Sequence, residues 1–264
     1  MAVNALPWSY SPVLGNPSET VILTGDEWHH LHHVLRMHEG QSLTLFDGKG
    51  RCMEGYIQRA TKSDGHIELV RDCSEDFAGH RDFRLTVAMA PTKQAERIEF
   101  AIEKLVEIGV DVIAFLDCAH GERTHVRYDR YEKIAISAAK QSRKLFLPRW
   151  IELISPVVYV EQCNRQGSIL ESSTVDPGLP SRPFDILCCH LDQDSSPLFA
   201  NYSHSRDVVV MIGPEGGFSK GEIEGLKLLG ARMVTLGPHR LRVETAAITA
   251  CAQVHLMHEM NSTT

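Results

Sequence analysis

The chain has 264 residues, of which 43% are apolar and 23% are charged, and its formal net charge is −7. These are the values of an ordinary globular protein, and the length suits one large domain or two modest ones. No apolar run approaches the length of a membrane span, and the first residues lack the basic region and apolar core of a signal peptide.

The cysteine content indicates a reducing compartment. The seven cysteines are odd in number and form no C-x-x-C motif, which favours free thiols. We therefore expect a cytoplasmic protein that has no membrane partner.

Residues 20–71 have the pattern of a small, mostly antiparallel β domain with one helix. Thr24–Glu27 has the form of a capping box and predicts a helix over Trp28–Arg36. Gln41–Phe46 alternates between polar and apolar residues and ends at Asp47-Gly48, a strong hairpin signal; the β pattern continues over 51–59 and 66–71.

The helix in this domain carries a histidine cluster, His29, His30, His32 and His33. His29 and His33 share a helix face, but no acidic or cysteine ligand lies at a recognisable spacing. A partly exposed helix face explains the cluster better than a metal site, and we expect no metal.

The next segments indicate a second domain of the β-α-β kind. Cys73–Asp82 is polar and acidic and is the expected linker. An apolar strand over Phe83–Ala90, an amphipathic helix over Gln94–Ile108 and a strand over Val110–Leu116 follow it. We therefore expect domains at 1–72 and 83–264, joined by residues 73–82.

One tract is strongly basic although the chain is acidic. Residues 123–149 contain eight lysines and arginines against two acidic residues, a local charge of +6. The tract includes a helix expected over Asp129–Arg143, with Ile134, Ala135, Ala138 and Ala139 inward. A single basic tract suits a site-specific RNA binder, although basic residues are also common at the solvated end of a helix.

The last third of the chain repeats one arrangement: an apolar strand, a Gly-Pro loop and a helix. Strands are expected over Phe184–His190, Asp207–Ile212 and Arg232–Leu236. Ser219 and Glu222 form a capping box for a helix that ends at Gly230. The final helix is expected from Glu244 to about 258, with Ile248, Cys251, Ala252 and Leu256 on one face.

The two Gly-Pro loops indicate a ligand site, because ligands of open α/β sheets bind outside the carboxyl ends of strands. Neither loop matches the phosphate-binding G-x-x-x-x-G-K-[ST] motif or the dinucleotide-binding G-x-G-x-x-G motif. The residues alone therefore indicate a small polar or nucleoside-like ligand, and two ordinary turns remain the alternative.

The motif pair GPEGGFSKGEIE and LGPHRLRVETAAITA resembles the signature of the RsmE-type 16S ribosomal RNA uridine-N3 methyltransferases, which belong to the SPOUT class. The resemblance covers nearly the whole chain. It implies a trefoil-knotted C-terminal α/β domain, a PUA-like N-terminal β-barrel domain that binds RNA, a homodimer, and S-adenosylmethionine as the methyl donor. The implied partner is 16S rRNA or the small ribosomal subunit.

The resemblance and the loops together give the expected site. Arg242 is the candidate for stabilising negative charge on uracil, and Glu244 and Glu215 are candidate proton acceptors; a purely structural role for Glu244 in the first helical turn is equally plausible. The expected cofactor-binding residues are Ile212, Gly213, Pro214, Glu215, Gly216, Gly217, Leu236, Gly237, Leu241, Arg242 and Thr245.

The expected RNA-binding residues lie in both domains: Arg36, Lys49, Arg51, Lys93, Arg123, Gln141, Ser142 and Arg143. Lys93 and the Gln141-Ser142 pair match places in the family pattern, whereas the glutamate often found before that pair is Lys140 here. Two alternative functions stay open: methylation of a different RNA position, and RNA binding without catalysis.

Overall fold

The structure is a computed structural model that describes residues 6–77, 83–121, 125–166, 183–193, 195–203 and 206–262. The chain divides into two compact units, Met1–His80 with Ile136–Leu147, and Arg81–Ala135 with Pro148–Thr264. The first unit thus includes 136–147, which the sequence analysis assigned to the second domain.

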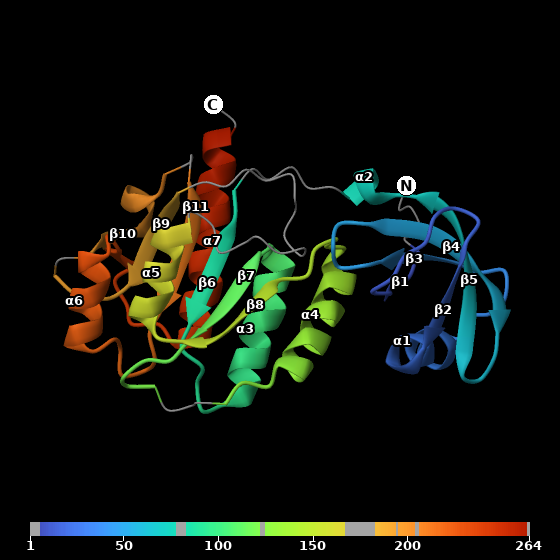
Figure 1. Cartoon of the computed structure of the whole chain (residues 1–264), viewed down its shortest axis with the longest axis horizontal. Helices are drawn as coiled ribbons and strands as arrows, with labels where there is room; N and C mark the ends of the chain where they lie inside the picture. Colours follow the sequence, from blue (N-terminus) through green and yellow to red (C-terminus); the bar gives the residue numbers. More distant parts are fainter. Residues whose placement is uncertain are drawn as a thin grey trace. The chain divides into compact units, whose positions relative to one another are not determined.

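The first unit is built on a five-stranded sheet with the strand order β1-β3-β4-β5-β2 (Figure 1). Strand β1 pairs with β3 in parallel, and the other pairs are antiparallel. The strands are β1 (Trp8–Tyr10), β2 (Thr20–Thr24), β3 (Ser42–Phe46), β4 (Cys52–Ala60) and β5 (Asp64–Asp72). The small, mostly antiparallel β domain is therefore confirmed, although β1 was not expected.

The predicted capping box at Thr24–Glu27 is wrong. Thr24 makes no side-chain capping bond. The Glu27 carboxylate instead accepts hydrogen bonds from the Ser9 hydroxyl at 2.6 Å, the Tyr10 amide at 2.9 Å and the Lys140 ammonium at 2.7 Å. Because the Glu27 carboxylate binds these three donors from elsewhere in the unit, it does not complete a capping box.

The helix that follows begins and ends earlier than the predicted range, Trp28–Arg36. It consists of α1 (Gly25–His29) followed by a π-helical turn, η1 (His30–Val34). Trp28 is buried, its indole nitrogen donates to the Thr61 carbonyl at 3.0 Å, and its ring covers Gly65 of β5. Burial does not alternate along strand β3, because Leu43, Thr44, Leu45 and Phe46 are all buried.

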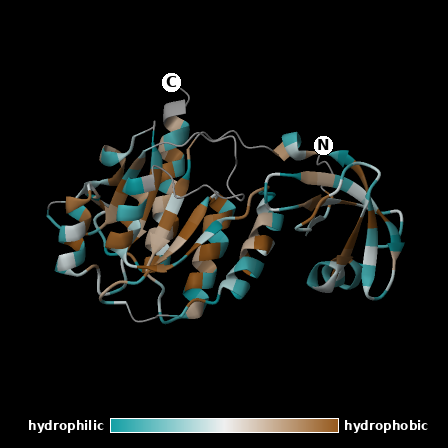
Figure 2. Ribbon diagram, in the orientation of Figure 1, coloured by the Kyte–Doolittle hydropathy of each residue, from teal (hydrophilic) through white to brown (hydrophobic). Residues whose placement is uncertain are grey.

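The second unit contains a seven-stranded parallel sheet with the order β10-β12-β9-β11-β6-β7-β8. Its strands are β6 (Leu85–Met89), β7 (Val112–Leu116), β8 (Arg149–Ile154), β9 (Phe184–Cys189), β10 (Ser196–Pro197), β11 (Asp207–Ile212) and β12 (Arg232–Thr235). Figure 2 shows much of this sheet as hydrophobic, as expected for strands covered by helices on both faces. The predicted α/β class is confirmed, and the trefoil knot stays a prediction.

Helix α2 (Ser74–Phe77) belongs to the first unit. The helices that follow it in the chain are α3 (Ala95–Ile108), α4 (Tyr128–Ser142), α5 (Pro156–Gln166), α6 (Lys220–Leu228) and α7 (Val243–Ser262), with a 3₁₀ turn, η2 (Leu198–Asn201). Helix α5 packs on β9 and α6, whereas α7 packs on β6, β11 and α3. In Figure 1, α5 lies in front of the sheet and α7 behind it.

The residues predicted to share one apolar face of the last helix differ in their burial. Cys251 is buried, but Ala252 and Leu256 are exposed. The buried stripe instead includes Ala250, Cys251 and Val254. Helix α7 carries apolar side chains on all its faces. Its sequence pattern therefore did not identify the face that packs against β6 and β11.

Candidate active site at the ends of three strands

Three neighbouring strands end at one edge of the larger sheet. Cys189 at the end of β9 is in register with Ile212 of β11 on one side and with Val234 of β12 on the other. A pocket of about 760 Å³ opens beside these strand ends. Its position, outside the carboxyl ends of parallel strands, is where α/β proteins bind ligands.

The first Gly-Pro loop forms one wall of the pocket. The Gly217 amide donates to the Pro214 carbonyl at 2.8 Å and closes a tight turn, with Gly217 at a φ of 75°. A Cβ atom on Gly213 would lie 3.0 Å from the Phe218 ring. Glycine at these two places therefore lets the backbone itself form the wall.

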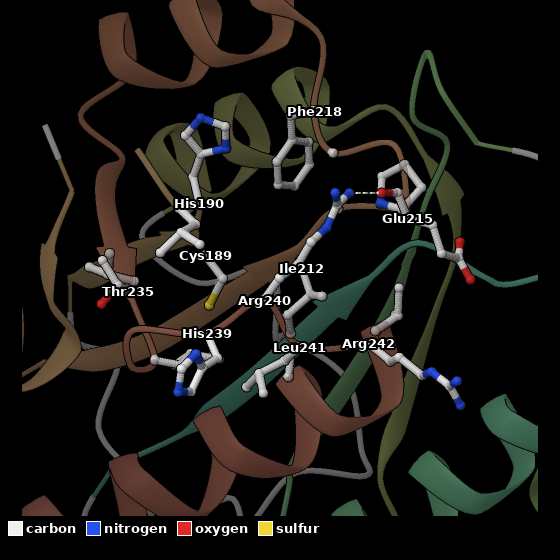
Figure 3. Close-up of a pocket in the computed structure, with 18 of the residues that line it drawn as sticks. Cys189, His190, Ile212, Glu215, Phe218, Thr235, His239, Arg240, Leu241 and Arg242 are labelled. Carbon is white, nitrogen blue, oxygen red and sulfur yellow. Dashed lines mark hydrogen bonds between the residues drawn. The ribbon is translucent and has the colours of Figure 1, made fainter. Parts of the chain in front are cut away.

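The second Gly-Pro loop forms the facing wall and is tied to the first. The Arg240 guanidinium donates to the backbone carbonyl of Glu215, which joins the two loops (Figure 3). From the last helix, the Gln253 side chain donates to the Leu236 carbonyl at 3.3 Å. The Ala246 amide donates to the Arg242 carbonyl at 2.8 Å. Helix α7 and Arg240 thus set the position of this loop.

A third loop, after β7, supports the first from outside. Glu222 accepts hydrogen bonds from the Ala119 amide at 2.8 Å and from the Ser219 amide at 2.7 Å. The Nδ1 atom of His120 lies 3.2 Å from the Gly217 carbonyl oxygen. The capping box predicted at Ser219 and Glu222 is confirmed, and the same carboxylate also anchors a neighbouring loop.

Most of the predicted cofactor residues line this pocket. They are Ile212, Gly213, Pro214, Glu215, Gly216, Gly217, Leu236, Gly237, Leu241 and Arg242; Thr245 is not among the lining residues. The prediction missed Cys189, His190 and Leu191, which line the pocket from the end of β9. The apolar run at 184–190 was recognised as a strand, and a parallel strand beside β11 places its carboxyl end at the same edge.

Cys189 gives the pocket wall an apolar rather than an ionic character. Its side chain is largely enclosed, and burial raises the pKa of the thiol to about 12. The thiol is therefore neutral near pH 7, and a nucleophilic role is not favoured at this cysteine.

Two charged side chains lie together at one side of the pocket. Figure 3 shows the Glu215 carboxylate and the Arg242 guanidinium on the same side, both directed away from Cys189 and Ile212. Both residues are exposed. A polar group that enters from this side meets a carboxylate and a cation next to the backbone walls.

Glu244 is in a different environment. It is 8% exposed, its Oε1 atom lies 3.7 Å from Nε of Arg97 on α3, and its Oε2 atom is buried without a hydrogen-bond partner. Glu244 does not line the pocket. Its ion pair links the first turns of α3 and α7, so the geometry favours a supporting role next to Arg242.

Six of the eight predicted RNA-binding residues fall within the first unit: Arg36, Lys49, Arg51, Gln141, Ser142 and Arg143. Lys49 forms a β-bridge with Phe146, so the tip of the β3–β4 hairpin lies beside the segment that follows Arg143. Arg36 and Arg143 have φ values of 55° and 57°. Such left-handed backbone is uncommon outside glycine and recurs at functional sites.

The other residues predicted to bind RNA differ in their hydrogen bonds and in their exposure. Arg51 donates to the carbonyls of Leu14 and Gly15, which favours a structural role for its guanidinium. Ser142 donates to the Ala138 carbonyl at 2.7 Å. Lys93 is exposed in the second unit, and Arg123 lies outside the described residues.

Ion pairs with acidic side chains offset part of the positive charge of the basic tract, residues 123–149. Arg127 and Arg130 both pair with Glu99 of α3, and Lys140 pairs with Glu27. Lys140 occupies the place where the resembled family often has a glutamate, and here it is a structural cation. Arg143 in this tract and Lys49 at the hairpin tip are exposed cations.

The described ranges contain neither a cluster of metal-binding side chains nor a membrane-spanning helix. Among those residues, no group of three or more His, Cys, Asp and Glu side chains is arranged to hold a metal ion. Within the same ranges, no helix is long and apolar enough to span a membrane.

A parallel α/β domain with a pocket at its strand ends, together with a small β domain, defines a two-domain ligand-binding protein. The family model described as RNA methyltransferase domain matches residues 80–255, and the model described as RNA methyltransferase PUA domain matches residues 23–70. The chain belongs to this RNA methyltransferase family, as the sequence resemblance predicted.

Named relatives and solved structures agree with this assignment. The chain is 27% identical over 254 residues to the ribosomal RNA small subunit methyltransferase E of Mycobacterium bovis, covering 94% of this chain and 90% of that protein. It is 28% identical over 234 residues to the protein of the same name from Rickettsia conorii, covering 87% of each.

Two crystal structures share the fold over nearly the full length. A probable rRNA-methyltransferase from Porphyromonas gingivalis is 32% identical, with a TM-score of 0.80, and the match covers 97% of this chain and 100% of that one. A ribosomal RNA small subunit methyltransferase E from Neisseria gonorrhoeae bound to S-adenosyl methionine is 25% identical, with a TM-score of 0.79, covering 96% and 98%.

Proposed function

We propose that this RNA methyltransferase transfers the methyl group of S-adenosylmethionine to N3 of a uridine in 16S ribosomal RNA. The observation that carries the proposal is the pocket at the ends of β9, β11 and β12, enclosed by two Gly-Pro loops that Arg240 ties together. The ribosomal RNA substrate is inferred from the relatives' names, and the cofactor is inferred from the Neisseria gonorrhoeae structure, which is bound to S-adenosyl methionine. The N3 position rests on the sequence resemblance.

The pocket fits such a cofactor. Its volume of about 760 Å³ lies within the usual range for small-molecule sites, which are mostly apolar with a few placed polar groups. Ile212, Leu241 and Cys189 supply apolar surface, while residues 213–217 and 236–237 supply backbone donors and acceptors. The cofactor supplies an electrophilic methyl group to this site.

The chain's own residues then act on the target base. Arg242 stabilises the negative charge that develops when uracil loses its N3 proton. Glu215 accepts that proton, since its exposed carboxylate lies on the same side of the pocket as Arg242 (Figure 3). Glu244, buried against Arg97, holds the first turn of α7 and thereby the position of Arg242.

Three substitutions separate these roles. Glu215→Gln removes the acceptor and lowers kcat by about 10²–10⁴-fold with little change in cofactor affinity. Glu244→Gln lowers stability and activity together, and Arg97→Ala does the same because both break one ion pair. If Glu244→Gln abolishes methylation in a protein of unchanged stability while Glu215→Gln is fully active, the two carboxylates have the opposite roles.

We also propose that the first unit holds the RNA through the hairpin tip and the segment after α4. Lys49, Arg143 and Arg36 provide the cations, and Gln141 is exposed beside Arg143. Each phosphate contact that is lost reduces the slope of log Kd against log salt concentration by about one. Lys49→Ala and Arg143→Ala should each lower this slope, and Arg165→Ala, an exposed arginine of α5 in the second unit, is the matched control.

The protein is proposed to act as a homodimer in the cytoplasm. Leu256 and Met260 on α7 are 57% and 66% exposed, and Phe199 on the contacting turn η2 is 71% exposed, an unusual amount of apolar surface for one region. Light scattering after size exclusion should give twice the chain mass, and Leu256→Glu should give the monomer. A monomeric wild-type protein at micromolar concentration contradicts the dimer.

Transfer of labelled methyl groups to small-subunit RNA tests the proposed function as a whole. The product nucleoside should be 3-methyluridine by mass spectrometry. Methylation of a different nucleoside supports the first alternative, a methyltransferase with another target. Tight RNA binding with no transfer to naked RNA or to assembled subunits supports the second, a binding protein without catalysis.

A further inference from the structure

Two cysteines of the first unit face each other across a pair of strands. Cys52 opens β4, and Cys73 follows the last residue of β5. The ladder pairs Met53 with Asp72, and the Cys73 amide donates to the Cys52 carbonyl at 3.0 Å. The two cysteines are therefore opposite neighbours, one step beyond the end of the ladder.

Their sulfur atoms are in direct contact. The Sγ atoms lie 3.0 Å apart, and the two residues are 0% and 1% exposed. One thiol donates a hydrogen bond to the other. This bond and burial raise the pKa of Cys52, while accepting the bond lowers the pKa of Cys73. Cys73 is thus the more nucleophilic of the two sulfurs, and its partner is already positioned.

We propose that Cys52 and Cys73 are a redox-sensitive pair that forms an intramolecular disulfide when a small peroxide oxidises the protein. The Cys73 sulfur attacks one peroxide oxygen, the O–O bond breaks, and a sulfenic acid and water form. The Cys52 sulfur then attacks the Cys73 sulfur, the S–O bond breaks, and a second water leaves. The two thiols lose two protons and two electrons, and hydrogen peroxide is reduced to two water molecules.

Because the two sulfur atoms are buried, a small oxidant reaches them more easily than a large one. A peroxide is small enough to reach a sulfur pair covered by the surrounding side chains, whereas a bulky disulfide such as oxidised glutathione must wait for local opening of the domain. Cys163 is also buried, but its hydrogen-bond partner is Tyr159 rather than a second thiol. In the part of the chain that the structure describes, no second cysteine sulfur is bonded to Cys163 to complete the reaction.

The position of the pair gives the bond a structural consequence. Residues 47–51 precede Cys52 and form the hairpin tip that carries Lys49, which is bridged to Phe146. Cys73 leads directly into α2, and the Ser74 hydroxyl accepts a hydrogen bond from the Cys52 amide at 3.0 Å. A disulfide here closes residues 52–73 into a loop and fixes the end of β4 beside the hairpin tip that is proposed to contact RNA.

Peptide mapping of the full-length protein tests the pair. The protein is treated with one equivalent of hydrogen peroxide, its remaining thiols are alkylated, and its peptides are identified by mass spectrometry. We expect a peptide cross-linked through Cys52 and Cys73, two hydrogen atoms lighter than its parts and released by dithiothreitol. If both cysteines are alkylated while other thiols are oxidised, the proposal is wrong.

Two further measurements sharpen the test. Oxidised glutathione should form the cross-link at least roughly tenfold more slowly than peroxide, and equal rates would contradict the burial argument. The oxidised protein should melt roughly 5 °C higher, and an unchanged midpoint would contradict the closed loop. Cys163→Ala should keep the cross-link and Cys73→Ser should lose it; the mapping of the wild-type protein decides even if Cys73→Ser fails to fold.

Discussion

The hydrogen bond from Arg240 to the Glu215 carbonyl links the two Gly-Pro loops of the proposed cofactor pocket. Arg240→Ala removes this link without removing any backbone group of the pocket wall. A single hydrogen bond of this kind contributes about 0.5–1.5 kcal/mol net. If the bond is made fully only when the loops enclose the cofactor, its loss weakens binding by about 2- to 12-fold.

Isothermal titration with S-adenosylhomocysteine measures this change directly. Arg240→Lys retains a cation and should recover part of the affinity, whereas His239→Ala removes an adjacent exposed side chain that also lines the pocket but makes no such bond, and should change the Kd less. Equal affinities for wild type and Arg240→Ala would refute the view that the link orders the pocket. A loss equal to that of His239→Ala would do the same.

Three other predictions concern stability and reactivity. Glu222→Ala removes the capping box of α6 and the bond to the loop after β7; we expect a loss of about 1–3 kcal/mol in urea unfolding together with weaker cofactor binding. Gly65→Ala places a Cβ about 2.1 Å from the Trp28 ring and should cost about 3 kcal/mol or more. Gly221→Ala is its control, because a Cβ there meets nothing within 4 Å; equal thermal midpoints for these two variants would contradict the packing argument. Since the pKa of Cys189 is raised to about 12, its alkylation rate should rise with every increase in pH up to that value, and a plateau below pH 9 would show that the thiol is not held neutral by burial.

The features that the sequence predicted well depend on residues close together in the chain. Helix α3 was expected from the spacing of Ile98, Ala101, Ile102 and Leu105, all of which are buried. The capping box at Ser219 and Glu222 needs only one helical turn. Strand β11 has the predicted bounds, because a β-branched run between turn residues is a local signal.

The features that the sequence did not predict depend on contacts between distant segments. Glu27 has the spacing of a capping residue, but Lys140, more than a hundred positions later, takes its carboxylate. Cys189, His190 and Leu191 line the pocket only because β9 lies between β11 and β12, an order that periodicity does not reveal.

The buried face of α7 was unclear for a related reason. Helix α7 carries apolar side chains on all its faces, so its packing against the sheet determines which of these side chains are buried. Leu256, predicted to share a face with Cys251, is 57% exposed, whereas Val254 is fully buried. The exposed residues are the ones that the proposed dimer uses.

The location of the bound cofactor tests the central claim most directly. A crystal structure of this protein with S-adenosylhomocysteine should show the ligand beside Cys189, Ile212 and Leu236, enclosed by the 213–217 and 236–242 loops, with Arg242 and Glu215 at its open side. Ligand density at any other place, or none at saturating concentration, would contradict the account.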